Sequence, residues 1–385
     1  MRRPLRVAML THSTLPRGGV VHAMCLSEAL DALGVETTLH GPDEARRGFF
    51  REPRCAAVAF PVEPAPRETA DMVEQRIGDY VRWFRRPENR GFDLYHAHDG
   101  IGANALATLK AEGLIRAFVR TVHHIDDFAD PRLVKRQARS IRAADARMVV
   151  SGLWRENLIA RFGREAEVVG NGVDASRYSP RHDGTEAELK DRLGLRAGPV
   201  FLSVGGVEAR KNTVRILRAF AEIHRARPDA RLVIAGGASL LDHRTYQAAF
   251  GRELTALGEG TSAVSLLGPV ADPDMPGLYR LASALVFASV KEGFGLCVLE
   301  AMASGTPVVA SRIAPFVDYL DPSDALWCDP ADSSSIAAAM RQSLRPEVAN
   351  ALRARGPLVA ARFGWGDVAE RHLPVYRRLR ESAHA

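Results

Sequence analysis

The chain has 385 residues, with 52 lysines and arginines against 46 aspartates and glutamates and a formal net charge of +6. This length suggests two domains or one large one, and a composition that is 46% hydrophobic and 25% charged excludes a disordered, collagen-like or coiled-coil protein. The small positive excess is spread over both halves without a basic block, so no nucleic-acid partner is predicted.

The first half alternates short apolar runs with helix-length amphipathic segments, which is the pattern of a parallel β-sheet covered by helices on both faces. Gly34 follows the first of these helices at the position where a terminating glycine is expected. The predicted strands are Leu5–Leu10, Val35–His40, Ala56–Phe60, Leu94–Ala97, Phe118–His123 and Met148–Ser151. The predicted helices are Val20–Leu33, Ala70–Phe84, Ala103–Lys110 and Leu133–Ala143.

The pattern breaks around Tyr178–Pro199, a polar segment with one short charged helix, which is the best candidate for a linker. The alternation then resumes with predicted strands Val200–Val204, Arg231–Ala235, Val264–Leu267, Ala284–Ala288 and Pro307–Ala310, and with predicted helices Val214–Arg225 and Leu296–Ser304. The sequence therefore predicts two doubly wound α/β units facing a cleft. Ligands of such sheets bind beyond the carboxyl ends of the strands.

Cysteine use and hydropathy indicate a protein of the reducing cytosol. The cysteines form no Cys-x-x-Cys pair, so neither a disulfide framework nor a zinc site is expected; they are Cys25, Cys55, Cys297 and Cys328. The N-terminal apolar run Val7–Leu10 is too short for a signal peptide, and no later run approaches about 18 apolar residues. We expect a cytoplasmic protein and leave peripheral contact with the inner face of the membrane open.

The most informative segment follows the predicted strand Ala284–Ala288 and opens a helix near Leu296. Its glycine loop presents backbone N–H groups and the positive end of a helix dipole, which suits a phosphate. Glu300 lies in an otherwise apolar helical turn, where a carboxylate is costly without partners. If Glu300 is considered alone, water or a neighbouring arginine would satisfy its carboxylate. Together with the glycine loop and Glu292, a pair of ribose hydroxyls is the favoured partner.

A second loop follows the predicted strand Val200–Val204 and superficially resembles a P-loop. The Walker pattern fails, because Arg210 stands at the second glycine position and Asn212 at the position of the Mg²⁺-binding hydroxyl. What remains is a Gly-Gly turn with two adjacent cations, Arg210 and Lys211, at the start of a helix. Cations there oppose the helix dipole, so an anion should compensate them. A solvated surface pair is the alternative.

Several features of the first half are individually weak. Gly18 and Gly19 follow the first strand without forming a GxGxxG fingerprint, and tight packing alone would explain them. Histidines and carboxylates gather in Thr121–Asp127, but one strand terminus cannot converge all of them on a metal ion. His96 and His98 share one strand face, and we interpret them as cleft lining or structure. No GxSxG or HExxH motif occurs, which argues against the usual hydrolases and zincins.

Together these segments resemble the retaining glycosyltransferases of family 4 (glycosyl transferases group 1), which have the GT-B fold of two Rossmann-like domains. The block from Glu292 to Pro307 resembles the Glu-x7-Glu motif of that family, with its Gly-Thr-Pro tail, and is highly specific. More modest matches follow one another along nearly the whole chain: Gly18-Gly19, Thr121-Val122-His123, Asn171-Gly172-Val173-Asp174, Val204-Gly205 with Lys211-Asn212, and Phe363-Gly364-Trp365 with Val375-Tyr376.

The resemblance implies a division of the chain into two domains. Residues 1–175, with a C-terminal helix over 364–385 that crosses back, would form the acceptor domain. Residues 176–363 would form the nucleotide-sugar donor domain. The acceptor site is expected near His12–Arg17, His123–Asp127 and Arg46–Arg90.

The resemblance also implies roles for single residues. Glu300 would hold the ribose, Glu292 a hydroxyl of the transferred sugar, and Lys211 would neutralise the diphosphate leaving group. The remaining assignments concern loops: backbone amides of Phe294, Gly295 and Leu296 would meet the sugar or diphosphate, Gly18-Gly19 would let the first domain approach it, and His123 would line the sugar pocket.

One position departs from the family pattern. The family commonly has arginine directly after the glycine at the strand end, where this chain has Gly206. The guanidinium of Arg210 is long and planar enough to contact two phosphate oxygens. We therefore predict that Arg210 supplies the second cation.

The implied protein is a bacterial, metal-independent, retaining hexosyltransferase without a cofactor. It would move a sugar from a UDP- or GDP-linked donor to a small-molecule, lipid or glycan acceptor, with fixed cations and a helix N-terminus in place of Mg²⁺. One alternative is a GT-B protein that binds nucleotide sugars without transferring them, which Gly206 favours. Another is a nucleotide-sugar epimerase, which the Glu-x7-Glu spacing disfavours. The missing GxGxxG motif argues against an NAD-dependent oxidoreductase.

Overall fold

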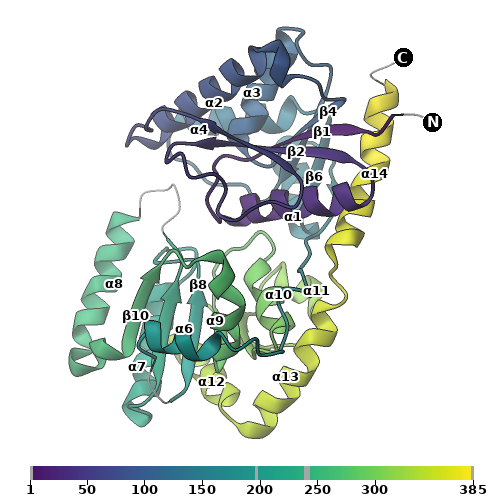
Figure 1. Cartoon of the computed structure of the whole chain (residues 1–385). Coiled ribbons are helices and arrows are strands. Elements are labelled where there is room, and N and C mark those ends of the chain that lie inside the picture. The colour runs from purple at the N-terminus through teal and green to yellow at the C-terminus, as the bar shows by residue number, and fades with distance from the viewer. Residues whose placement is uncertain (1–2, 196–197, 238–242, 383–385) are drawn as a thin grey trace. The chain divides into compact units, whose positions relative to one another are not determined.

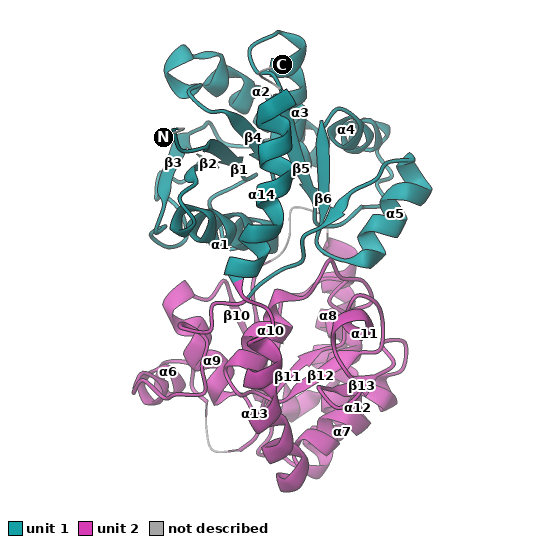
Figure 2. Ribbon diagram, turned by 90° about the vertical axis from the view of Figure 1, so that its right-hand side faces the viewer, with its two compact units in different colours: residues 1–172, 365–385 teal, residues 173–364 magenta. Residues whose placement is uncertain are grey.

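The computed structural model describes residues 3–195, 198–237 and 243–382 (Figure 1). The chain forms two compact units: unit 1 takes Met1–Gly172 and Trp365–Ala385, and unit 2 takes Val173–Gly364 (Figure 2). Each unit is built on a parallel sheet with helices on both faces, which confirms the predicted class of two doubly wound α/β units. The expected boundaries, 175/176 and 363/364, lie within three residues of the observed ones.

Unit 1 contains a seven-stranded parallel sheet in the order β3-β2-β1-β4-β5-β6-β7. The strand order reverses between β1 and β4, and the loops that follow these two strands lie where doubly wound sheets bind ligands. The strands are β1 (Arg6–Leu10), β2 (Glu36–Asp43), β3 (Ala56–Pro61), β4 (Leu94–Ala97), β5 (Phe118–Val122), β6 (Ala146–Val149) and β7 (Glu167–Val168). The helices are α1 (Gly18–Ala32), α2 (Thr69–Arg85), η1 (Pro87–Asn89), α3 (Gly100–Ala111), α4 (Pro131–Arg142), α5 (Gly152–Phe162) and α14 (Trp365–Ser382).

Unit 2 contains a six-stranded parallel sheet in the order β10-β9-β8-β11-β12-β13, which reverses between β8 and β11. The strands are β8 (Val200–Val204), β9 (Arg231–Ala235), β10 (Val264–Gly268), β11 (Ala284–Phe287), β12 (Val308–Ser311) and β13 (Leu326–Cys328). The helices are α6 (Glu186–Arg192), α7 (Thr213–Ala226), α8 (Arg244–Ala256), η2 (Gly258–Ala263), η3 (Asp272–Asp274), α9 (Met275–Leu281), α10 (Leu296–Ala303), α11 (Phe316–Tyr319), α12 (Ser333–Ser343) and α13 (Pro346–Ala360).

Burial explains why the predicted elements were recognisable in the sequence. The central strands β1, β4, β5, β8 and β11 are buried along almost their whole length, as expected for strands covered on both faces. In α7, Ile216, Phe220 and Ile223 recur at helical spacing and enter one apolar core with α12. Gly34 ends α1 with a φ of 81°, as predicted.

The sequence pattern missed some elements and misplaced the linker. Helices α5 and α8 bury few residues, so they carry a weak amphipathic signal. The segment Tyr178–Pro199 is not a linker but part of unit 2, where α6 packs against α9 and the rings of Tyr178 and Tyr279 are 5.9 Å apart. Its polar composition reflects a surface position. Among the described helices, none has both the length and the apolar character that crossing a bilayer requires.

The C-terminal helix α14 belongs to unit 1, as predicted, where it packs against α1. A buried hydrogen-bond chain holds it to the sheet: His96 Nδ1 lies 2.6 Å from the Tyr376 hydroxyl, and His96 Nε2 lies 2.7 Å from Thr121 Oγ1. All three side chains are fully buried. Because both nitrogens of His96 are engaged, the imidazole is a structural link between β4, β5 and α14.

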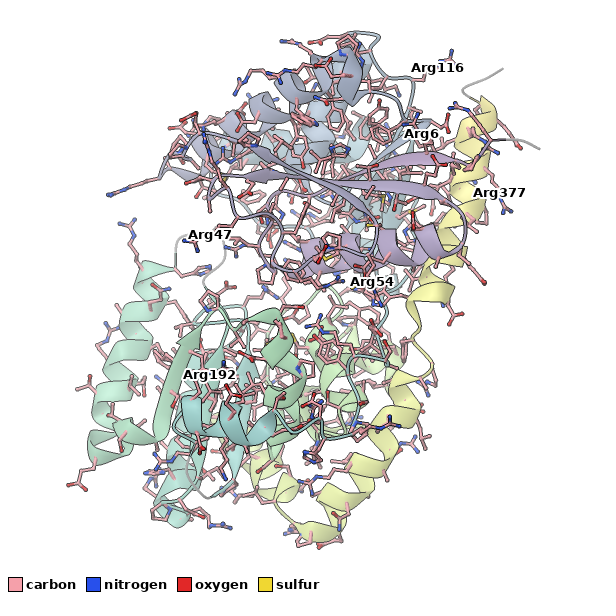
Figure 3. The ribbon with its side chains drawn as sticks, viewed as in Figure 1. Arg6, Arg47, Arg54, Arg116, Arg192 and Arg377 are labelled. Atoms are coloured by element: carbon pink, nitrogen blue, oxygen red, sulfur yellow. The ribbon has the colours of Figure 1, made fainter. Side chains whose placement is uncertain are left out.

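We expect Tyr376→Phe to destabilise the protein, because it removes one partner of a buried imidazole. The loss in unfolding free energy should be about 1–3 kcal/mol, measured as a lower midpoint of urea denaturation. Arg377→Gln is the matched control, since Arg377 lies on the same helix and points away from the ribbon (Figure 3). Equal midpoints for the two variants would show that the His96–Tyr376 contact contributes nothing.

Candidate functional site

The loops after β8 and β11 meet at the switch point of unit 2. A backbone bond joins them directly, from the Val290 N–H to the Arg210 carbonyl at 3.0 Å. Asn212, which precedes α7 with a φ of 61°, donates from Nδ2 to the carbonyls of Ala288 at 2.9 Å and Pro330 at 2.7 Å. This buried amide therefore fixes the loop that carries Arg210 and Lys211 against the end of β11.

The meeting of these loops forms an ion cluster around Glu292. One carboxylate oxygen, Oε1, lies 2.8 Å from Lys211 Nζ and 2.8 Å from Arg210 Nη1. The Lys211 ammonium also lies 4.3 Å from the centre of the Phe287 ring. Burial alone would raise the pKa of Glu292, but Lys211 and Arg210 outweigh it, and the pKa lies below its ordinary value. Glu292 is thus the anion that the two adjacent cations require.

The Gly-Gly turn after β8 admits no larger side chain at either position. Gly205 and Gly206 have φ values of 128° and 74°. A Cβ on Gly206 would lie 2.8 Å from the Gly237 carbonyl oxygen and 2.9 Å from that of Gly236. A Cβ on Gly205 would lie 2.4 Å from Lys211 Cε. The backbone of this chain therefore excludes arginine at position 206, and the Gly206→Arg exchange is incompatible with the observed turn.

The loop after β11 ends at the N-terminus of α10. Gly295 precedes the helix with a φ of 94°, and a Cβ there would lie 2.6 Å from the Phe316 ring. Phe294 stacks on Tyr319 with ring centres 4.6 Å apart, and the Tyr319 hydroxyl donates to the Phe294 carbonyl at 3.1 Å. No described side chain caps α10. Its first backbone N–H groups, from Leu296 onward, are therefore suited to an anionic ligand.

Glu300 lies on α10, one helical turn from that N-terminus. Its Oε2 accepts a hydrogen bond of 2.7 Å from the Tyr279 hydroxyl. In this structure a tyrosine therefore makes the contact for which the sequence suggested water or a neighbouring arginine. Burial raises the pKa of Glu300 above its ordinary value, although the Tyr279 hydroxyl and the charge of Arg177 act in the opposite direction. Hydrogen bonding from the hydroxyls of Tyr279 and Tyr178 therefore holds a carboxylate that loses solvation at this position.

In unit 1, Gly18, Gly19 and His123 lie together. The two glycines begin α1, and a Cβ on Gly19 would lie 3.5 Å from His123 Cδ2. Burial lowers the pKa of His123 well below its ordinary value, so the imidazole is neutral at pH 7. His124 instead pairs with Asp126 at 3.1 Å on the exposed side of the same segment. The two adjacent histidines of this segment therefore lie in different surroundings, His123 beside Gly19 and His124 beside Asp126.

Sequence reasoning missed Tyr279 and His22, and it named Asn212 without foreseeing the contacts that this residue makes. Tyr279 and Asn212 act through contacts with residues distant in the chain, which leave no local pattern. His22 is buried on α1, with Nδ1 2.6 Å from Asn171 Oδ1. Two features of the sequence could have indicated His22: it lies three residues after Gly19, and its partner Asn171 belongs to one of the segments that resemble the family.

Two family models match the chain, one in each half. The model described as Glycosyltransferase Family 4 matches residues 16–177, and the model described as Glycosyl transferases group 1 matches residues 198–345. The D-inositol 3-phosphate glycosyltransferase of Kineococcus radiotolerans is 30% identical over 76% of this chain and 73% of its own length. The protein of that name from Acidothermus cellulolyticus is 28% identical over 97% of this chain and 90% of its own length.

Solved structures resemble the chain over nearly its full length. Sucrose-phosphate synthase from Thermosynechococcus elongatus matches with a TM-score of 0.77 and 20% identity, over 98% of this chain and 100% of the synthase. The Anabaena protein HepE in complex with UDP-glucose matches with a TM-score of 0.73 and 18% identity, over 99% of each chain. At these identities the likeness establishes a shared fold.

Glu300→Gln should stabilise the ligand-free protein at neutral pH. Because the pKa of Glu300 is raised in the folded state, its ionisation lowers folding stability as pH rises from the unfolded value through the folded value. A neutral amide avoids that loss and still accepts from Tyr279. We expect a higher melting temperature than the parent at pH 7 and a smaller difference at about pH 4, near the unfolded pKa. A lower melting temperature at pH 7 would contradict the assignment of Glu300 as a costly, partly buried carboxylate.

Proposed function

The chain belongs to glycosyltransferase family 4 and has the GT-B fold, as its motifs predicted, and from this premise we propose that it is a retaining hexosyltransferase using a UDP- or GDP-linked sugar. The observation that carries the proposal is the Glu292 cluster, in which two cations and an uncapped helix N-terminus surround the end of β11. The relatives support it, since they include glycosyltransferases and a protein in complex with UDP-glucose.

The diphosphate of the donor would bind where positive charge is already fixed. Lys211 and Arg210 approach one oxygen of Glu292, and Arg210 also lies 3.8 Å from the buried carboxylate of Glu208. A diphosphate would therefore bind by competing with these carboxylates for the two cations. The side chain of Arg210 is 40% exposed, whereas that of Lys211 is 10% exposed. Lys211 is therefore suited to the buried phosphate oxygen and Arg210 to an outer one. The first amides of α10 would add hydrogen bonds without any change of charge.

The two acidic residues would position the rest of the donor. Glu300 would accept hydrogen bonds from the ribose hydroxyls with the carboxylate that Tyr279 holds in place. Glu292 would accept a hydrogen bond from a hydroxyl of the transferred sugar while it orients the cations. Backbone amides of Phe294, Gly295 and Leu296 would meet the sugar or the diphosphate.

Transfer would proceed by departure of the nucleoside diphosphate and attack of the acceptor on the same face of the sugar. The bond between the anomeric carbon and the diphosphate oxygen breaks, and its electron pair goes to that oxygen. The acceptor hydroxyl oxygen forms the new bond on that same face and gives its proton to the departing diphosphate oxygen, so the anomeric configuration is retained. The developing charge on the leaving group meets Lys211, Arg210 and the α10 dipole, which are preorganised donors. In this proposal fixed cations fill the role for which other enzymes use Mg²⁺.

Unit 1 would supply the acceptor site. The neutral imidazole of His123 packs against Gly19 at the start of α1, where no bulky side chain is present. We assign His123 to the sugar pocket and Gly18-Gly19 to the approach of the diphosphate. The acceptor would be a small molecule, a lipid or a glycan.

A second candidate is a protein that binds the donor without transferring the sugar. It is favoured by Gly206, because the turn that contains this residue excludes the arginine common in the family. Measurement of turnover separates the two candidates, since only the transferase releases nucleoside diphosphate in proportion to glycosylated product.

We expect transfer to survive removal of metal ions. Purified protein supplied with UDP- and GDP-hexoses and a panel of acceptors should give a product with the configuration of the donor, at a rate in EDTA no lower than that without it. The anomeric configuration is read by NMR of the product. Loss of activity in EDTA with recovery in Mn²⁺, or an inverted product, would contradict the mechanism.

The two cations should contribute unequally to transfer. Lys211→Ala should lower kcat about 100- to 1,000-fold, because charge on the leaving group grows in the transition state. Arg210→Ala should lower kcat/KM about tenfold, equivalent to ~1.4 kcal/mol. Arg218→Ala is the control, since Arg218 is an exposed cation that pairs with Glu253. Parent-like kcat/KM for Arg210→Ala in an active enzyme would remove the role assigned to Arg210.

A further inference from the structure

Three histidines from separate parts of unit 1 come together beside the sheet. His22 comes from α1, His98 follows β4, and His123 follows β5. One nitrogen from each ring lies within 4.8 Å of the others. The ring centres are 4.7 Å apart for His22 and His123, 5.3 Å for His22 and His98, and 5.8 Å for His98 and His123. We call these three residues the histidine triad.

Four ring nitrogens of the triad are buried without protein partners in the described part of the chain. This holds for Nε2 of His22, both ring nitrogens of His98 and Nε2 of His123. His22 Nδ1 lies 2.6 Å from Asn171 Oδ1, which only accepts, so the proton is on Nδ1 and Nε2 carries a lone pair. Buried polar nitrogens without a partner are costly, and their gathering at one place indicates a ligand.

The contrast with His96 makes the pattern specific. His96 adjoins the triad, with its ring centre 4.2 Å from that of His98, but both of its nitrogens are engaged by Tyr376 and Thr121. The same region thus satisfies one imidazole completely and leaves three others open toward one another.

The triad imidazoles are neutral and ready to donate lone pairs. Burial lowers the pKa of His22 to about 4 and the pKa values of His98 and His123 well below their ordinary range. A metal ion binding at pH 7 would therefore displace no proton from them. The hydrogen bond from His22 to Asn171 matches the outer contact that commonly orients a metal-ligating histidine.

We propose that His22, His98 and His123 bind a divalent transition-metal ion that prefers imidazole, such as Zn²⁺ or Co²⁺. Three histidines leave a fourth coordination position for water or a ligand oxygen. With metal–nitrogen bonds of about 2.1 Å, two ligands of a tetrahedral site lie about 3.4 Å apart. The three ring nitrogens lie within 4.8 Å of one another, so each ring must move about 1 Å toward the ion when it binds. The ion is not a requirement for transfer.

Because His123 is also assigned to the sugar pocket, the bound ion should inhibit transfer, and this consequence rests on the proposed function. Binding itself is measured without turnover. Failure of the transferase proposal therefore leaves the metal site testable.

The test is titration of the EDTA-treated, dialysed full-length protein with Co²⁺ and, by calorimetry, with Zn²⁺. We expect about one ion per chain and the intense visible absorption of tetrahedral Co²⁺. His98→Ala should weaken binding tenfold or more. His40→Ala is the matched control, since His40 is buried in unit 1 with both nitrogens unpartnered among the described residues but packs against Phe84 and Phe92.

X-ray absorption of the Zn²⁺-loaded parent protein provides a second readout that does not depend on a folded variant, and should show three imidazole ligands. Fewer than three imidazoles, the weak spectrum of octahedral Co²⁺, or equal affinities for His98→Ala and His40→Ala would overturn the proposal. In that case ordered water would be the partner of the triad.

Discussion

The candidate site of unit 2 depends on one carboxylate, Glu292, that two cations share. Buried charges are tolerated only when they are paired, and the buried carboxylate of Glu292 after β11 pairs with Lys211 and Arg210 after β8. Asn212 and the backbone bond at Val290 hold the same two loops together. The result is a preorganised group of charges at the switch point of the sheet, beside the N-terminus of α10. A diphosphate entering that place would compete with Glu292 for the same cations.

The fold and the site loops could be predicted because they are encoded locally. Strands such as Val200–Val204 are apolar runs, and the glycines before α10 signal a turn into a helix. The ion cluster could not be predicted, because Lys211 and Glu292 are 81 positions apart and only the pairing of β8 with β11 brings them together. The Tyr279–Glu300 contact was missed for the same reason. The linker was misplaced because the segment Tyr178–Pro199, on the surface of unit 2, has the polar composition that is typical of linkers.

Unit 1 shows how neighbouring histidines acquire different roles. Alternation along a strand places His96 and His98 on one face, but it does not say which partners they find. Tyr376 and Thr121 engage the nitrogens of His96, so it fixes α14 to the sheet. His98 has no such partners among the described residues and instead faces His22 and His123. The difference arises from α14 and α1, which lie far from β4 in sequence.

The affinity of Glu292→Gln for free UDP and GDP tests the account most directly. If the carboxylate and a diphosphate compete for Lys211 and Arg210, removal of the negative charge leaves both cations to the nucleotide. The variant should then bind the preferred nucleoside diphosphate more tightly than the parent in a calorimetric titration at low salt, while sugar transfer falls. Weaker binding of the nucleotide by Glu292→Gln, in a variant that unfolds at the temperature of the parent, would contradict the claim that this cluster is the diphosphate site.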